Sequence, residues 1–112
     1  MRWNDSTPIY LQIKESICCS IIEMHINEGE TIPSIREFSS ENRVNPLTVS
    51  KAYQLLVEEG ILLKRRGLGM IVNDNARQML LKQQRTVFIK TEWPAIQKKI
   101  ARLGLTIEEL IS

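Results

Sequence analysis

Apolar and polar positions recur at helical spacing between Asn45 and Gly60, in the sequence NPLTVSKAYQLLVEEG. Because successive helical residues are turned by about 100°, the apolar side chains collect on one face. Asn45 is a favourable N-cap, Pro46 suits the first helical position, and a glycine such as Gly60 commonly ends a helix. The pattern predicts one helix whose apolar face consists of Val49, Ala52, Tyr53, Leu56 and Val57. The opposite side carries Leu47, Thr48, Ser50, Lys51 and Gln54.

The polar side of this helix suits a phosphate-lined groove, where hydroxyls, amides and a lysine find partners. An ordinary amphipathic surface helix has the same pattern, so the neighbouring segments must decide. Ser34 and Glu37 form the S-x-x-E signature of a capping box, which predicts a second helix from Ser34 to about Asn42. Only Arg43 and Val44 separate the two helices. Two short helices with a tight connection are the arrangement of a helix-turn-helix.

Two β-compatible runs, Ile61–Lys64 and Met70–Val72, follow the second of these helices. The residues between them, RRGLG, combine consecutive positive charges with two glycines. A glycine-containing connection between two short strands predicts a hairpin, here a basic wing. The segment Thr31–Ile32 can add a short strand that completes a small sheet with this hairpin.

A longer helix is expected at the start of the chain, from Pro8 to about His25, with Thr7 as its cap. Residues 1–7 are polar and predict a loose arm in which only Trp3 is a candidate for packing. One apolar stripe consists of Tyr10, Ile13, Ile17, Ile21 and Met24, and a second of Leu11, Cys18 and Ile22. The second stripe fits either a contact with the tail helices of this chain or a partner, or one broad face on a single core.

The tail after Val72 predicts three further helices. The first runs from about Asn75 to Lys90, and Thr91 is expected to cap the next, with Pro94 in its first turn. Gly104 is expected to end that helix, and Thr106 opens a last short one with a second capping box. Apolar residues recur in the middle helix as a narrow seam of Trp93, Ile96, Ile100 and Leu103. The predicted organisation is a helix-turn-helix with its wing at residues 1–73, called the reader below, and a helical tail at residues 74–112.

The length of 112 residues bounds the chain to one compact domain, or to one small domain with an appendage, and the net charge of +2 is unremarkable. The distribution of charge along the chain is more informative than its sum. Residues 1–74 carry 8 Lys and Arg and 10 Asp and Glu, whereas residues 75–112 carry 7 Lys and Arg and 3 Asp and Glu. The basic residues of the reader are nevertheless placed where they can form one patch. Its members are Arg36, Lys51, Lys64, Arg65 and Arg66.

Several classes of function are poorly supported by the sequence. His25 is the only histidine, and we find no nucleophile motif, phosphate loop or metal-ligand cluster, so an enzyme, a metal site or a cofactor is not expected. The adjacent Cys18 and Cys19 are expected to be reduced thiols in a helix. With no signal peptide and no apolar run near 18 residues, we expect a cytoplasmic protein that does not enter a membrane.

The run PSIREFSSENRVNPLTVSKAYQLLVEEGILLKRRGLGMIV resembles the winged helix-turn-helix of the GntR family of bacterial transcription factors. The matching elements are Pro33-Ser34 with Arg36-Glu37, Val44 with Thr48-Val49, Glu59-Gly60 and Gly67-x-Gly69. The upstream PIYLQI, Asn45-Pro46, Ser50-Lys51-Ala52-Tyr53 and the short tail are most similar to the YtrA-like subgroup. The resemblance implies a mainly α (α+β) fold, a winged helix-turn-helix followed by a short helical dimerisation tail.

The resemblance also implies a sequence-specific, homodimeric transcriptional repressor that binds double-stranded DNA at an inverted-repeat operator. Whether it has a small-molecule effector is left open. The expected DNA contacts are Ser34, Arg36, Asn45, Leu47, Thr48, Ser50, Lys51, Arg65, Arg66 and Gly67. The expected dimer contacts are Leu80, Val87, Phe88, Trp93, Ile96, Ile100 and Leu103. Leu47 and Met70 depart from the subgroup pattern, which affects the expected base preference. A winged helix that binds protein is the alternative, and the polar, basic surface of Thr48, Ser50 and Lys51 argues against it.

Overall fold

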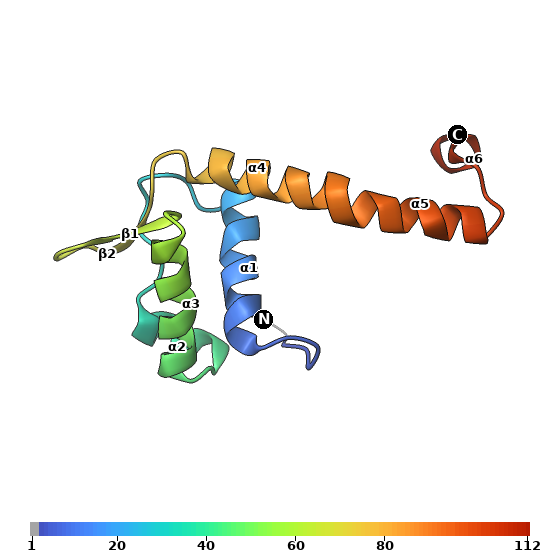
Figure 1. Cartoon of the computed structure of the whole chain (residues 1–112). Coiled ribbons are helices and arrows are strands. Elements are labelled where there is room, and N and C mark those ends of the chain that lie inside the picture. The colour runs from blue at the N-terminus through green and yellow to red at the C-terminus, as the bar shows by residue number, and fades with distance from the viewer. Residues whose placement is uncertain (1–2) are drawn as a thin grey trace. The chain divides into compact units, whose positions relative to one another are not determined.

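The computed structural model describes residues 3–112, which form six α-helices, one π-helical turn and two strands (Figure 1). The helices are α1 (Ile9–Ile22), α2 (Ile35–Asn42), α3 (Pro46–Glu58), α4 (Ala76–Val87), α5 (Trp93–Arg102) and α6 (Ile107–Ile111). The strands are β1 (Leu62–Arg65) and β2 (Gly69–Val72), and the π-helical turn η1 covers Phe88–Glu92. None of the helices in the described part of the chain is long and apolar enough to cross a membrane. The expected mainly α fold with a small β-wing is confirmed.

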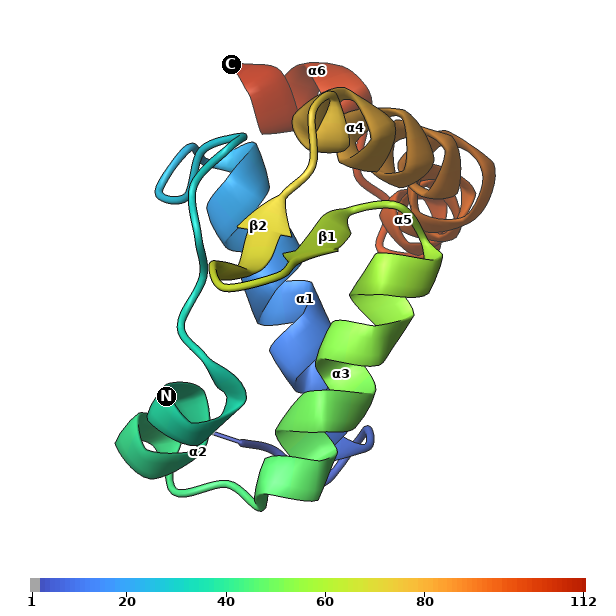
Figure 2. The ribbon, with the colours of Figure 1, turned by 90° about the vertical axis from the view of Figure 1, so that its left-hand side faces the viewer.

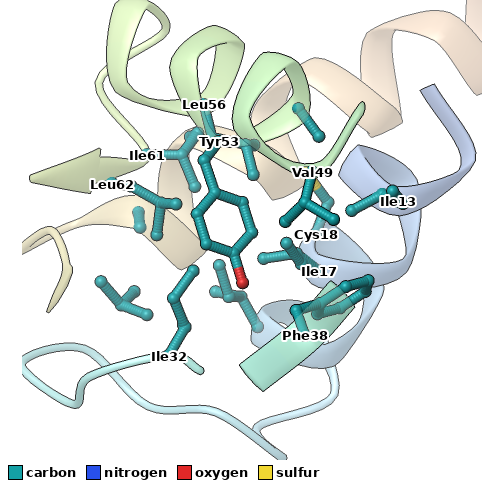
Figure 3. Close-up of a cluster of buried hydrophobic side chains, with 14 of the residues drawn as sticks. Ile13, Ile17, Cys18, Ile32, Phe38, Val49, Tyr53, Leu56, Ile61 and Leu62 are labelled. Atoms are coloured by element: carbon teal, nitrogen blue, oxygen red, sulfur yellow. The ribbon is translucent and has the colours of Figure 1, made fainter. Parts of the chain in front are cut away.

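The chain divides into two compact units, of which the first ends at Leu80 and the second is Leu81–Ser112. In the first unit α3 packs against both α1 and α2, and buried side chains from all three helices and the hairpin meet in one core (Figure 3). Tyr53 lies at its centre, with only 1% of its surface exposed. The core consists of Ile13, Ile17, Cys18, Ile21, Ile32, Phe38, Val44, Val49, Ala52, Tyr53, Leu56, Ile61, Leu62, Val72, Ala76 and Leu80.

Both helices of the helix-turn-helix begin at the predicted caps. The Oγ atom of Ser34 accepts from the Glu37 N–H at 3.1 Å, and the Ser34 N–H donates to the Glu37 carboxylate at 3.0 Å. Asn45 caps α3 by accepting from the Leu47 N–H at 2.8 Å. Between the helices Arg43 takes a left-handed conformation with φ of 52°. This single left-handed residue turns the chain sharply enough for α3 to follow α2 directly.

The end of α3 turns into the hairpin through Gly60. This residue has φ of +78°, a conformation in which a side chain is strained, and an added Cβ would lie 3.4 Å from Met79. The hairpin then pairs Leu62 with Val72 and Arg65 with Gly69 at its two ends. The predicted third strand is present as one antiparallel bridge between Thr31 and Ile71. The wing is therefore a two-stranded ribbon with one short edge segment.

The first helix differs from its prediction at both ends. Thr7 does not cap it, because Pro8 takes the N-cap position without a side-chain hydrogen bond. The helix ends at Ile22 rather than near His25, because Met24 adopts a left-handed φ of 64° and the chain turns. Within residues 3–7 the predicted arm is not loose: Gln12 bonds the backbone N–H and C=O of Asn4, and Trp3 packs against the core. The first two residues of the predicted arm lie outside the described residues.

The first turn of α4 belongs to the first unit. Ala76 is fully buried and Leu80 is 2% exposed. Glu28 accepts from the Arg77 N–H at 3.2 Å, and the Arg77 Nε donates to the Ile22 carbonyl at 2.9 Å. The compact unit therefore extends past the predicted boundary after Asn73, because the start of α4 completes its core.

The second unit corrects the prediction that Thr91 starts a new helix. The backbone remains helical from α4 through η1 into α5, and the Trp93 N–H donates to the Phe88 carbonyl, five residues back. Pro94 follows directly, and a widened π turn is a known way for a helix to accommodate a proline whose ring would clash with the preceding turn. The later signals hold: Gly104 ends α5 with φ of 70°, and a Thr106–Glu109 capping box opens α6.

The core geometry generates a test of how α2 is attached to α3. The Tyr53 hydroxyl donates to the Pro33 carbonyl at 2.7 Å, just before the Ser34 cap. Tyr53→Phe should lower the free energy of unfolding by about 1 kcal/mol, the net value of one hydrogen bond, as measured by urea denaturation. Tyr10→Phe is the control, because the Tyr10 hydroxyl forms no hydrogen bond within residues 3–112. Equal stability of Tyr53→Phe and the parent chain would show that this bond does not attach α2.

Candidate nucleic-acid interface

The N-terminal half of α3 presents an exposed face of mixed chemistry. Leu47, at the start of this face, is 78% exposed. Thr48 and Ser50 are half-buried at its flanks. The Asn45 side-chain oxygen is used by the cap, which leaves its amide N–H groups free to donate. The expected contact residues of the first half of α3 therefore lie close to the exposed apolar side chain of Leu47.

The start of α2 lies beside this face and carries Arg36, whose side chain is exposed. Ser34 was expected to hold a phosphate through its hydroxyl and the helix N-terminus. The Ser34 oxygen already accepts from Glu37, whose carboxylate occupies the same helix end. Hydrogen bonds from the Ser34 backbone and side chain lower the pKa of Glu37, so this carboxylate is charged at neutral pH. A phosphate here would therefore rely on Arg36, because Glu37 engages both the Ser34 hydroxyl and the helix N-terminus.

Lys51 also lies on the exposed side of α3, but its ammonium group is not free. Its Nζ atom lies over the ring of Tyr10, 4.0 Å from the ring centroid. This contact joins residues far apart in the sequence, so no local pattern predicted it. Tyr10 was expected only to pack, and it does contact the core as a half-buried residue.

The hairpin carries the other expected contacts at its tip. Arg65, Arg66 and Gly67 are all exposed, and the Leu68 N–H donates to the Arg65 carbonyl at 3.0 Å to close the turn. Leu68 was not among the expected site residues, yet it is 63% exposed between two glycines with positive φ. In Figure 1 the hairpin projects past α2 and α3.

These elements share one side of the first unit. Figure 2 views this side, where α2 and α3 lie in front of α1 and the hairpin lies beside the C-terminal end of α3. Within residues 3–112 the salt bridges are Lys14–Glu59 and a His25–Glu23 contact, so none neutralises a basic residue of this face. We call Arg36, Lys51, Arg65 and Arg66 the reader cations. Uncompensated positive charge beside hydroxyl and amide groups is the surface chemistry that phosphate backbones and base edges require.

The expected dimer contacts separate into two groups. Leu80 is part of the core of the first unit and is not available to a partner. The other six lie in the second unit, where no residue is buried, and Ile96 is 41% exposed. Phe88 and Trp93 stack with ring centroids 6.4 Å apart. The remaining group is Val87, Phe88, Trp93, Ile96, Ile100 and Leu103.

Comparison with known proteins places the chain among regulators. Residues 9–72 match the model of "Bacterial regulatory proteins, gntR family". The HTH-type transcriptional repressor YtrA of Bacillus subtilis is 34% identical over 105 residues, which span 94% of this chain and 80% of that protein.

Solved structures agree with this sequence match. A GntR family transcriptional regulator from Listeria monocytogenes superposes with a TM-score of 0.76 at 28% identity, covering 97% of this chain and 94% of that one. AraR(DBD), solved in complex with an operator, gives a TM-score of 0.58 at 30% identity, covering 64% and 87%. The family match covers the whole helix-turn-helix and the wing described above. The chain is therefore a member of the GntR family of bacterial transcriptional regulators, with a DNA-binding winged helix-turn-helix domain.

Proposed function

We propose that the protein acts as a homodimeric repressor that binds an inverted-repeat operator. The observation that carries this proposal is the set of uncompensated reader cations on the exposed surfaces of α2, α3 and the hairpin, together with the exposed polar start of α3. The related AraR(DBD) was solved on an operator, which supports the same use of the fold here. In this proposal the winged helix-turn-helix reads DNA and the helical tail after it makes the dimer.

The start of α3 is assigned to the major groove. Asn45, Thr48 and Ser50 offer donors and acceptors to base edges or phosphates, and Lys51 offers a charge. The exposed Leu47 suits a thymine methyl group, because burying it in the groove removes apolar surface from water. These contacts carry the sequence preference.

The other contacts are assigned to the DNA backbone. Arg36, in the first turn of α2, reaches a phosphate or a guanine edge. Arg65, Arg66 and Gly67 at the hairpin tip reach the backbone or the minor groove. Such contacts orient the protein on the duplex and make binding depend on salt.

The dimer is assigned to the apolar side chains of the second unit. Large apolar residues there remain exposed, and contiguous exposed apolar surface commonly marks an association site. A second copy of the chain offers a self-complementary partner through two-fold symmetry. Two recognition helices related by this symmetry would lie about 34 Å apart, so the operator half-sites should be about 10 base pairs apart or a multiple of that.

Repression is the regulatory outcome that we assign. The relative YtrA carries the name of a transcriptional repressor, and its match spans nearly all of this chain. A dimer bound across one or more turns of DNA at a promoter occupies surface that RNA polymerase requires. No further domain is needed for this mode of action.

The first test concerns Arg36. Arg36→Ala should leave the fold intact and cost on the order of 1–3 kcal/mol in binding to an operator selected from a random DNA library. Fluorescence anisotropy at two salt concentrations measures the loss and the flatter salt dependence of a lost phosphate contact. Arg85→Ala removes the same charge from the exposed side of α4 and is the control. If both variants bind alike, the start of α2 does not contact DNA.

The second test concerns the hairpin. Replacing Arg65 and Arg66 together by alanine should weaken operator and random DNA to a similar degree, and lower the salt slope by about two, since each phosphate contact contributes about 0.9. The paired change of Lys82 and Arg85 to alanine is the matched control for charge. A loss restricted to the operator would instead assign base reading to the hairpin.

The third test concerns the dimer. Ile96→Asp places a charge in the proposed apolar contact, and the cost of desolvating it should convert the dimer to a monomer that retains only weak, non-specific DNA binding. Gln97→Asp adds the same charge at an exposed polar position of α5 and should remain dimeric. Light scattering and a DNA footprint on the same samples measure both effects. A monomeric parent chain, or an Ile96→Asp dimer that protects both half-sites, would contradict this assignment.

A further inference from the structure

Tyr10 and Lys51 form a contact that the roles assigned above do not use. Tyr10 is in the first turn of α1, half-buried against the core, and Lys51 projects from the exposed side of α3. The Lys51 ammonium lies 4.0 Å from the centroid of the Tyr10 ring, within the range of a cation–π interaction. Because α1 and α3 pack along each other, both ends of the contact have fixed backbones.

A second lysine between the same two helices provides a comparison for how the charge of Lys51 is compensated. Lys14 of α1 pairs with the Glu59 carboxylate just after α3, so its charge is neutralised. The Tyr10 ring is uncharged, and no acidic side chain within residues 3–112 pairs with Lys51. The ring therefore restrains the Lys51 ammonium without cancelling its charge.

The position of Lys51 makes this restraint useful. Lys51 lies four residues after Leu47, so the two side chains share one face of α3. A free lysine has several rotatable bonds and loses conformational entropy when it is held against a phosphate. An ammonium that already lies over a ring at the edge of the exposed α3 face loses less conformational entropy when it binds a phosphate.

We propose that Tyr10 is a positioning residue for DNA binding, whose ring holds the Lys51 ammonium in place for a phosphate at the edge of the α3 contact. This inference rests on the proposed DNA-binding role of the reader cations. It extends the DNA site to the first turn of α1, a helix assigned so far only to packing. The ring is the required part of Tyr10, and its hydroxyl is not.

A double-mutant cycle tests the inference. Tyr10→Leu keeps apolar volume but removes the ring, and should weaken operator binding by about two- to fivefold, the worth of an exposed cation–π contact. In a Lys51→Met background the same change should have no further effect. Tyr10→Phe, the conservative variant, should bind as tightly as the parent chain. In the free protein, the Lys51 side-chain protons should show an upfield ring-current shift that Tyr10→Leu abolishes and Tyr10→Phe keeps.

The other outcomes overturn the inference. A merely structural role of Tyr10 would weaken binding equally in the parent and Lys51→Met backgrounds, with thermal unfolding of each variant as the check on folding. Tighter binding by Tyr10→Leu would show that the ring holds Lys51 away from DNA. Arg36→Ala, measured in parallel, separates the two proposals: if it loses affinity while the cycle shows no coupling, DNA binding stands and only the role of Tyr10 fails.

Discussion

The Tyr53 side chain connects α3 to α2 and to the segment before α2, within the first compact unit. Its ring is almost fully buried, packs edge-on against Phe38 of α2 at 6.2 Å between centroids, and donates its hydroxyl to the Pro33 carbonyl. Burial raises the pKa of Tyr53, so the hydroxyl stays a neutral donor. One residue of α3 therefore holds the loop into α2 and a side chain within α2. The geometry between Arg36 and the start of α3 depends on this attachment.

Local signals predicted most of the helix boundaries. The capping boxes at Ser34 and Thr106 and the Asn45 cap all form as expected. Gly60 and Gly104 take the positive φ that ends α3 and α5. Each of these features is decided by residues within a few positions of one another, where side-chain chemistry and backbone preference act together. The placement of the expected contact residues of α3 and of the wing on one side of the unit follows from the same elements.

Features that depend on distant residues were not predictable in the same way. The end of α1 depends on the turn at Met24, and Leu80 is buried because α4 packs its first turn into the core. The contact of Lys51 with Tyr10 crosses two helices and has no sequence spacing of its own. Thr91 resembled a cap, yet a helix that continues keeps the backbone hydrogen bonds that a new start would lose.

The π-helical turn at Phe88–Glu92 changes the register of the tail helix. In a regular α-helix two residues five apart differ by about 140° in direction, so Phe88 and Trp93 would point to different sides. The wider turn instead lets the two rings stack. The turn acts as a one-residue insertion that the helix has absorbed. Adding or removing one residue in this segment would therefore rotate the side chains of α5 about the helix axis. A relative with one residue fewer here would need apolar residues at different positions to present the same face.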